Sequence, residues 1–137
     1  MLLELNFGFL GDYPVAGMAE PWRSKIDPTL ELLQQAGIRA VLTLTEDNFY
    51  ADHYRQARMR HRHEPMNDGE PASWEALARS VTFINACLEK QQPVVAHCLE
   101  GRGRTGMVLA AWLGAAEKID GPTAVQRLRE LRPVTVL

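Results

Sequence analysis

Apolar residues along the chain follow two patterns, and these predict strands and helices. Short runs that are continuously apolar, or that alternate with polar residues, are typical of strands. Longer segments in which apolar residues recur every three or four positions predict helices with one buried face. The expected strands are residues 3–7, 15–18, 38–44, 58–64 and 93–96. The expected helices are residues 27–36, 50–58, 73–88, 105–116 and 122–132.

The alternation of strands and helices predicts an α/β fold. We expect a central, mostly parallel sheet of four to five strands that is flanked by helices. The chain length of 137 residues fits one domain that spans residues 1–137. Residues 93–96 are continuously apolar, as in a central strand, and ligands bind such folds at the carboxyl ends of the strands. We therefore expect the loop from Cys98 to Arg104, between a central strand and a helix, to bind the ligand.

Composition and charge exclude several classes of protein. A net charge of −2 is too small to suggest a nucleic-acid binder, and no apolar run approaches the length of a membrane span. The N-terminal segment contains Glu4 and no basic residue before its apolar residues, unlike a signal peptide. Two cysteines, Cys87 and Cys98, do not make a disulfide scaffold and favour a reducing compartment. We therefore expect a cytoplasmic protein. We also expect it to act as a monomer.

The loop carries two overlapping motifs that imply different chemistry. Residues 101–106 match the G-x-G-x-x-G pattern of a dinucleotide-binding turn. That fold also needs a second strand about 20 residues later, ending in an acidic residue that binds the ribose. Residues 123–130 are helical in pattern and basic instead, and too few residues follow Gly106 to complete a nucleotide-binding sheet. The dinucleotide interpretation is therefore rejected.

The second motif, HCLEGRGRT at residues 97–105, suits a cysteine nucleophile in a phosphate-binding loop. The thiolate is the reactive form of cysteine, and helix N-termini and nearby arginines favour it. Gly101 and Gly103 allow the backbone N–H groups to turn inward around a phosphate. Arg104 can bind two phosphate oxygens through its planar guanidinium, and the Thr105 hydroxyl can hydrogen-bond the sulfur.

This pattern resembles the signature His-Cys-x2-Gly-x2-Arg-Ser/Thr of the cysteine-dependent protein tyrosine phosphatases. Together with NFGFL, VAGMAEP and LLQQAGIRAVLTLTE, it makes nearly the whole chain similar to the small atypical dual-specificity phosphatases. The resemblance implies a phosphocysteine enzyme that needs no metal or other cofactor. It implies Cys98 as nucleophile, Arg104 as a catalytic phosphate-binding residue, and His97 behind the loop, where it tunes the cysteine. The substrate-binding residues that it implies are Leu99, Glu100, Gly101, Arg102, Gly103 and Arg104.

The family also uses an aspartate on a mobile loop upstream of the cysteine, usually with a proline a few residues later. Asp68-Gly-Glu-Pro71 fits this arrangement, 30 residues before Cys98 and just before a predicted helix. The chemistry needs such an acid, because the leaving alkoxide must be protonated as its bond to phosphorus breaks. Glu70 and Glu64 are alternative acids. The resemblance implies that Asp68 then activates the water that hydrolyses the phosphocysteine.

The expected function is hydrolysis of phosphomonoesters, with phosphotyrosine in proteins as the main substrate and phosphoserine or phosphothreonine as further ones. Phosphate, sulfate or vanadate would occupy the loop. An alternative is a phosphatase of phosphoinositides or other non-protein phosphates, since Arg102 occupies a loop position where some lipid-directed relatives carry a basic residue. A third hypothesis, from another class, is a phosphate-binding module without turnover. The presence of Cys98, Arg104 and Asp68 argues against that module.

Several other residues have a structural and a functional interpretation. Cys87 is expected to pack in the core, with a redox role as the alternative. The basic segment from Arg58 to His63 predicts a solvated strand face, with docking of an acidic partner or a metal site at the histidines as alternatives.

The remaining residues are expected around the pocket or in the core. Glu46, at the end of a predicted strand, is expected either near the pocket or in a helix or turn. Glu100 is expected at the pocket rim, paired with Arg102. The three tryptophans are expected in the core or at its rim: Trp22, Trp74 and Trp112.

Overall fold

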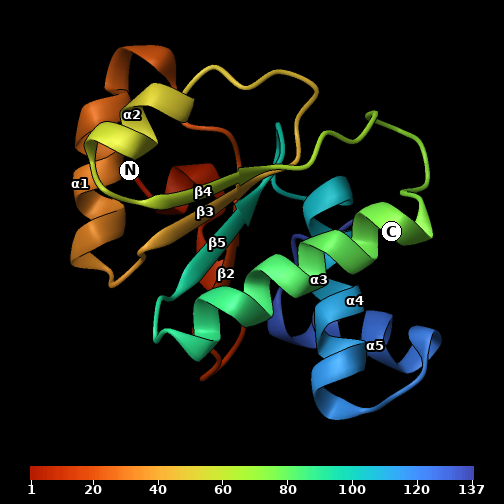
Figure 1. Cartoon of the computed structure of the whole chain (residues 1–137). Coiled ribbons are helices and arrows are strands. Elements are labelled where there is room, and N and C mark those ends of the chain that lie inside the picture. The colour runs from red at the N-terminus through yellow and green to blue at the C-terminus, as the bar shows by residue number, and fades with distance from the viewer.

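Five strands form one sheet in the order β1-β2-β5-β3-β4 in the computed structural model, which describes residues 1–137. The strands are β1 (Gly8–Phe9), β2 (Val15–Met18), β3 (Ala40–Thr43), β4 (Arg60–His63) and β5 (Val94–His97). Strands β2, β5, β3 and β4 are parallel, and β1 is antiparallel to β2 (Figure 1). The predicted α/β fold with a mostly parallel sheet is therefore confirmed, and β5 is its central strand.

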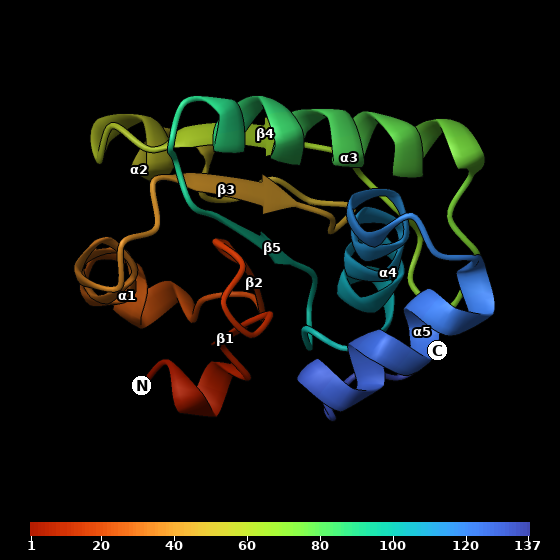
Figure 2. The ribbon, with the colours of Figure 1, turned by 90° about the horizontal axis from the view of Figure 1, so that it is seen from below.

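Helices cover both faces of this sheet. Figure 2 shows α1 on one side of the sheet and α4 and α5 on the other. The helices are α1 (Ile26–Gln35), α2 (Ala51–Gln56), α3 (Trp74–Glu89), α4 (Gly103–Glu117) and α5 (Gly121–Leu131). Two 3-10 turns, η1 (Leu3–Leu5) and η2 (Arg23–Lys25), complete the chain. Ser73 and Asp120 cap α3 and α5 by accepting hydrogen bonds from backbone N–H groups of the first turns, which fixes where these two helices begin.

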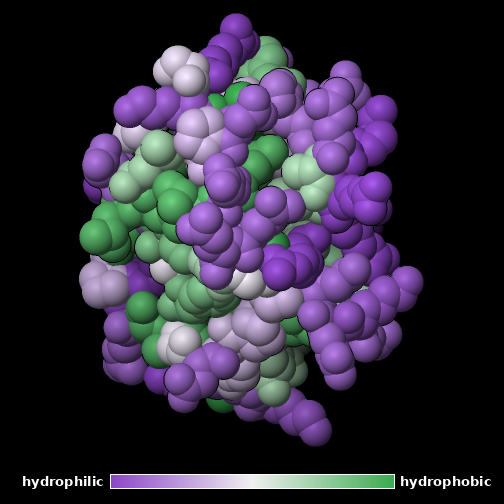
Figure 3. Space-filling view, turned by 90° about the vertical axis from the view of Figure 1, so that its left-hand side faces the viewer, coloured by the Kyte–Doolittle hydropathy of each residue, from purple (hydrophilic) through white to green (hydrophobic).

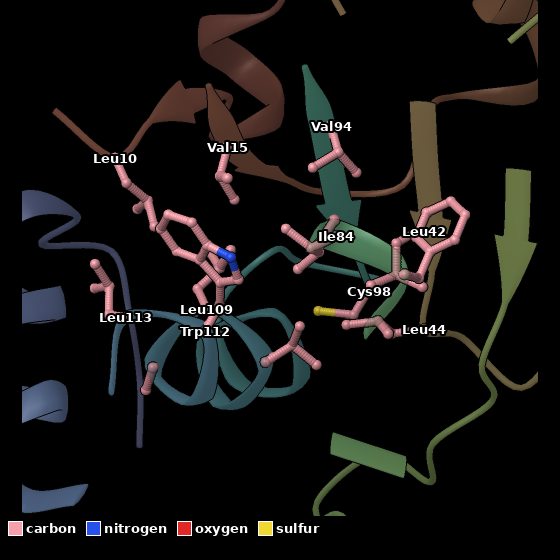
Figure 4. Close-up of a cluster of buried hydrophobic side chains, with 14 of the residues drawn as sticks. Leu10, Val15, Leu42, Leu44, Ile84, Val94, Cys98, Leu109, Trp112 and Leu113 are labelled. Carbon is pink, nitrogen blue, oxygen red and sulfur yellow. The ribbon is translucent and has the colours of Figure 1, made fainter. Parts of the chain in front are cut away.

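Two apolar clusters, one on each face of the sheet, form the core. Successive side chains of a strand point to opposite faces, so Val94 and Ala96 join the cluster with α3 and α4 while Val95 joins the cluster with α1 and α2. Every residue of β2, β3 and β5 is buried, as expected of strands that are covered on both sides. Figure 4 shows Cys98 among the side chains of the first cluster, near Ile84 and Leu44. The residue expected as nucleophile is therefore anchored in the core.

The N-terminal segment differs from the prediction. Residues 3–7 were expected to form an edge strand, but Leu3–Leu5 form a 3-10 turn and only Gly8–Phe9 pairs with β2. Leu2 and Leu5, three residues apart, pack on the cluster with α1 and α2, while Leu3 is exposed. A spacing of three places these two leucines on one side of a tight turn. The expected strand is wrong because this packing outweighs the short alternating pattern.

Two helix starts also differ. Helix α1 begins at Ile26 after η2, so Asp27 lies inside the first turn and is not the cap. Helix α4 begins at Gly103, two residues before the expected start at Thr105. The N–H groups at its beginning therefore adjoin the loop directly, and the positive end of the helix dipole lies there.

Strand β4 is only partly the solvated face that the basic segment predicts, and Arg58 just before it is exposed. His61 and His63 lie on one side of the strand and Arg60 and Arg62 on the other, and all four are half-buried. The His61 ring packs 4.7 Å from the Tyr54 ring. Tertiary contacts therefore cover part of these side chains, while the Arg62 side chain stays 40% exposed. No group of three or more His, Cys, Asp or Glu residues is arranged to hold a metal ion.

The surface over α1 and α2 is divided in character. In Figure 3 hydrophilic side chains fill one side of this face, and hydrophobic side chains gather along the other.

Among the tryptophans, Trp112 is buried and Trp22 lies at the rim, but Trp74 is exposed, so the prediction for Trp74 is wrong. None of the helices combines the length and the hydropathy of a membrane-spanning segment.

Candidate active site

Four parallel strands end at the same edge of the sheet, and a candidate site residue follows each of them. Glu20 comes shortly after β2, Glu46 after β3, Asp68 after β4 and Cys98 directly after β5. Ligands bind α/β folds in the crevice outside this edge. The sheet therefore gathers residues that are far apart in the sequence around the loop that precedes α4.

The loop carbonyls are all bonded to groups outside the pocket. The carbonyl oxygens of Leu99, Glu100 and Gly101 accept hydrogen bonds from Glu20 N, Asn6 Nδ2 and Arg132 Nη2, at 3.0, 3.0 and 2.9 Å. The Arg102 carbonyl accepts from Gly106 N in the first turn of α4.

These contacts set the direction of the N–H groups. In a trans peptide the C=O and the following N–H point in opposite directions, and the chain contains no cis peptide. The N–H groups of residues 100–103 therefore face the other way from the bonded carbonyls, and none of Leu99–Arg102 donates to an acceptor within the chain. Convergent backbone N–H groups at a helix N-terminus form an anion site.

Gly101 is the residue that the loop geometry requires to be glycine. Its φ of +75° lies in the left-handed region, and a Cβ there would lie 2.5 Å from the carbonyl carbon of Met18, at the end of β2. The loop is thus pressed against the backbone of the neighbouring strand, and a side chain does not fit between them.

We expect Gly101→Ala to lower the free energy of unfolding by about 2–4 kcal/mol, because it adds both backbone strain and a backbone clash. Chemical denaturation measures this loss. Gly37→Ala is the matched control: Gly37 also has a positive φ, but nothing lies within 4 Å of its Cβ position. Equal losses in the two variants would show that the contact with Met18 has no cost.

Cys98 lies at the base of the loop. The residue is only 3% exposed, and the hydroxyl of Thr105 in the first turn of α4 donates to its sulfur at 3.1 Å. Cys98 and Thr105 therefore meet as the motif suggested. A hydroxyl that donates to sulfur stabilises the thiolate form, both before attack and when the sulfur is a leaving group.

His97 is buried behind the loop and contacts two groups. Its Nε2 lies 2.9 Å from Thr43 Oγ1, and its Nδ1 lies 3.3 Å from the carbonyl oxygen of Cys98. Thr43 Oγ1 also lies 2.9 Å from Nε2 of His61, which links β4, β3 and β5. Burial lowers the pKa of His97 to about 4, so the ring is neutral at physiological pH. Burial likewise lowers the pKa of His61 to about 4.

The lowered pKa values of these two histidines make stability depend on pH. The unfolded chain binds protons at an ordinary histidine pKa near 6.5, while folded His97 takes up its proton only near 4. Stability is therefore full above about pH 6.5 and falls as the pH drops toward 4. For His97 alone we expect a loss of about 2 kcal/mol between pH 7 and pH 5. Urea unfolding of wild type and His97→Asn at both pH values measures it, and the two proteins losing the same amount would contradict the expectation.

Arg104 is buried. One side of its guanidinium contacts other protein groups, and the other side has no hydrogen-bond partner in the protein. Its Nη1 donates to Glu46 Oε1 at 2.5 Å and to the Met66 carbonyl at 3.0 Å. Its Nε has no hydrogen-bond partner and lies 3.8 Å from Asp68 Oδ1. One side of the guanidinium is thus fixed by the ends of β3 and β4. An unpaired buried donor is costly unless an acceptor such as a phosphate oxygen binds it.

Glu46, for which the sequence left two roles open, is the residue that orients Arg104. A hydrogen bond from its own backbone N–H, followed by that from Arg104, holds the pKa of Glu46 below its usual value. It is therefore a carboxylate at neutral pH and an acceptor for the guanidinium. Its Oε2 also accepts from Asp68 N at 3.4 Å, so Glu46 connects the two candidate catalytic residues.

We expect Glu46→Gln to reduce kcat/KM for a small aryl phosphate roughly ten- to a hundredfold, because a misplaced guanidinium loses its alignment with the phosphate. Steady-state kinetics on 4-nitrophenyl phosphate measure the loss. Glu46→Asp, which keeps the charge but shortens the reach, should recover little of it. Full activity in Glu46→Gln would mean that other contacts hold Arg104.

Asp68 lies on the loop between β4 and α3 and faces the pocket. Its side chain is 72% exposed, and Gly69 beside it turns the chain with a φ of +76°. Of the two alternative acids, Glu64 is buried and paired with Arg62 and Arg79 at 3.1 and 2.7 Å. Burial alone would raise the pKa of Glu64, but hydrogen bonds from these arginines hold it below its usual value, which is unsuitable for a proton donor.

The other alternative acid, Glu70, points to a different partner. Its Oε2 accepts from Asn67 Nδ2 at 3.0 Å, and no ion pair joins it to Arg104. Asp68 is thus the one of the three candidate acids whose carboxylate lies in the pocket beside the Nε of Arg104, at 3.8 Å. The geometry favours Asp68 over both alternatives.

Arg132 is a site residue that the sequence motif did not reveal. It is buried after α5, donates to the Gly101 carbonyl, and lies 3.0 Å from the Cβ position of Gly17. Burial lowers its pKa to about 10, so it stays charged at neutral pH. No carboxylate lies within ion-pair distance of it. Its positive charge therefore lies against the loop, and a negative charge on Cys98 favours the charged form of Arg132.

The pocket entrance is rich in carboxylates. Arg104 and Asp68 line two adjoining hollows of about 150 and 550 Å³. The smaller hollow also contains Glu20, Glu46 and Asp47. Glu100 is exposed at the rim as expected, but it forms no ion pair with Arg102, so that part of the prediction is wrong. The carboxylates at the entrance outnumber its arginines.

Comparison with known proteins identifies the family. A family model described as a polymorphic toxin system DSP-PTPase phosphatase matches residues 16–116, which include the loop and its strands. The chain belongs to this family. The resemblance to the small dual-specificity phosphatases is thereby confirmed, and this member is a phosphatase of the dual-specificity and tyrosine phosphatase fold.

Solved structures and one curated protein are similar to this family member. The active form of Tk-PTP is 26% identical with a TM-score of 0.83, and the alignment covers 96% of this chain and 87% of that one. PTPMT1 in complex with PI(5)P is 18% identical with a TM-score of 0.76, covering 89% and 81%, and shows the fold alone. The phosphatidylinositol 3,4,5-trisphosphate 3-phosphatase cnrN of Dictyostelium discoideum is 27% identical over 123 residues. That match covers 82% of this chain but only 19% of the relative's length.

Proposed function

We propose that this phosphatase hydrolyses phosphomonoesters through a phosphocysteine at Cys98. The observation that carries the proposal is the loop itself, whose carbonyls are all bonded outward while its N–H groups are free around Cys98. Such a site binds a phosphate dianion and stabilises the charge that develops on it in the transition state.

The first step transfers the phosphoryl group to sulfur. The Cys98 thiolate attacks phosphorus in line with the leaving oxygen, a sulfur–phosphorus bond forms, and the phosphorus–oxygen bond breaks. The free Nε side of Arg104 and the loop N–H groups hold the three equatorial oxygens. Asp68, which faces Arg104 across the pocket, donates its proton to the leaving oxygen.

The second step returns the enzyme to its starting state. Asp68, now a carboxylate, takes a proton from water as the water oxygen attacks phosphorus. The sulfur–phosphorus bond breaks and the thiolate leaves with the hydrogen bond from Thr105. Inorganic phosphate is released, which leaves Asp68 protonated and Cys98 as a thiolate for the next cycle.

The proposed substrate is phosphotyrosine in proteins, with phosphoserine and phosphothreonine as further candidates. Its support is the acidic entrance, where Glu20, Asp47 and Glu100 disfavour a substrate that carries several additional phosphates. A phosphoinositide is the second candidate, and the similarity to cnrN and the exposed Arg102 favour it. We further propose that the protein acts as a soluble monomer in the cytoplasm.

Turnover of 4-nitrophenyl phosphate from pH 5 to pH 8 with EDTA present tests the function. Rapid acid quenching followed by mass spectrometry should show a phosphoryl group on the peptide that contains Cys98. Turnover without such an adduct contradicts the covalent mechanism. An inactive protein that still binds inorganic phosphate is instead a binding module.

A further inference from the structure

A second hollow adjoins the phosphate loop on the side of β2. This flanking groove measures about 460 Å³ and is lined by Glu4–Asn6, Ala19–Arg23, Phe49–Tyr50, Leu99–Glu100 and Arg102. Residues 99, 100 and 102 belong to the loop as well. The groove therefore adjoins the phosphate site. Residues that directly flank a phosphorylated residue in a substrate can reach it.

The groove presents exposed apolar side chains. Trp22, Phe49 and Leu99 are 41%, 49% and 53% exposed, and they are three of the seven large hydrophobic residues that the whole chain exposes. Phe49 is held in place, because the Arg23 guanidinium lies 4.2 Å over its ring and Tyr50 packs against its edge. Exposed apolar groups that gather in one hollow mark a binding surface, and fixed aromatic rings lose little entropy on binding.

The groove is also acidic. Glu4, Glu20 and Glu100 line it, while one of its two arginines, Arg23, already lies over Phe49. Burial, and next the charge of Asp47, raises the pKa of Glu20 although Arg23 and Arg104 act against the shift, and no cation lies within ion-pair distance of this carboxylate. A lysine or arginine side chain would compensate these carboxylates, whereas a further phosphate would be repelled.

We propose that the flanking groove binds the residues beside the phosphotyrosine of a peptide substrate. An aromatic or large apolar residue packs against Trp22 and Phe49, and a basic residue pairs with Glu20 and Glu100. The inference rests on the proposed function and narrows it, since it favours phosphopeptides with basic and aromatic flanks over acidic peptides and phosphoinositides.

Kinetics on matched peptides test the groove. We expect kcat/KM to be about tenfold higher for phosphotyrosyl peptides flanked by phenylalanine and lysine than for the same peptides with glutamate at those positions. In Glu20→Gln combined with Glu100→Gln the part of this preference that comes from lysine should disappear, while the part that comes from phenylalanine should remain. Trp22→Ala should lower kcat/KM for the preferred peptide about tenfold more than kcat/KM for 4-nitrophenyl phosphate. Trp74→Ala is the matched control, because Trp74 is 85% exposed and lines no part of the groove. It should change neither value.

Binding separates a failure of the groove from a failure of the chemistry. Fluorescence anisotropy of the same labelled peptides on Cys98→Ser should show the same order of affinity. Equal affinities and equal rates for basic and acidic peptides would overturn the groove proposal alone. A wild type that prefers the basic peptide in binding but does not turn over 4-nitrophenyl phosphate would overturn the proposed function alone. A higher kcat/KM for a short-chain phosphatidylinositol trisphosphate than for every peptide would also overturn the groove proposal.

Discussion

Cys98→Ser is expected to lower turnover of 4-nitrophenyl phosphate by about 10⁴-fold or more, while the fold and phosphate binding are kept. A serine hydroxyl needs a general base to become a nucleophile, and none contacts this position. Both ring nitrogens of His97 are occupied, by Thr43 and by the Cys98 carbonyl. Steady-state kinetics give the loss, and titration with inorganic phosphate shows whether the loop still binds an anion.

Cys87→Ala is the control for this variant. Cys87 is the other free cysteine, and it is buried in the same core cluster at α3, where burial raises the pKa of its thiol. We expect Cys87→Ala to lower stability but to retain turnover at low temperature, because an inert buried thiol takes no part in the reaction. Substantial turnover in Cys98→Ser, or loss of all turnover in folded Cys87→Ala, would contradict the assignment of the nucleophile.

Asp68→Asn is expected to lower kcat by about 10²–10³-fold for substrates with poor leaving groups. An amide cannot give a proton to the leaving oxygen, although it keeps the size of the side chain beside Arg104. The loss should be smaller for 4-nitrophenyl phosphate, whose leaving group is already stable as an anion. The fall in rate at high pH that comes from deprotonation of the acid should disappear as well.

Glu70→Gln is the matched control, because Glu70 is another carboxylic acid on the same loop. Its carboxylate contacts Asn67 and not Arg104, so we expect less than a twofold change for any leaving group. Kinetics on a series of aryl and alkyl phosphates measure both variants. A loss that is independent of the leaving group in Asp68→Asn, or a larger loss in Glu70→Gln, would reassign the proton donor.

The location of the site follows from the parallel sheet more than from any single motif. Four strands deliver Glu20, Glu46, Asp68 and Cys98 to one edge, where the N-terminus of α4 also lies. The buried side chains beneath hold this edge rigid, and Cys98 itself is part of that core. A phosphate at this edge therefore meets a prearranged set of donors, which is the condition for stabilising a transition state.

The sequence by itself determined the central part of this protein. The strand β5, the loop and the start of α4 are contiguous, and the constraints on them are local: glycines for curvature, a buried strand before and a helix after. The candidate nucleophile, the loop residues and Arg104 could therefore be predicted from residues 97–105, and the candidate acid from the spacing that the family resemblance implies. The alternation of strands and helices was likewise enough to predict the α/β architecture.

Only the tertiary structure decided what holds that loop in place. Glu46 is 58 residues from Arg104, Asn6 is 94 residues from Glu100, and Arg132 is 31 residues from Gly101. It also showed that Leu3–Leu5 form a turn, that Glu64 is paired with arginines, and that Arg102 is not paired with Glu100. Each of these outcomes depends on which side chains meet across the sheet edge. Local propensity carries no information about such contacts, because packing and buried charge determine them only after the strands are placed side by side.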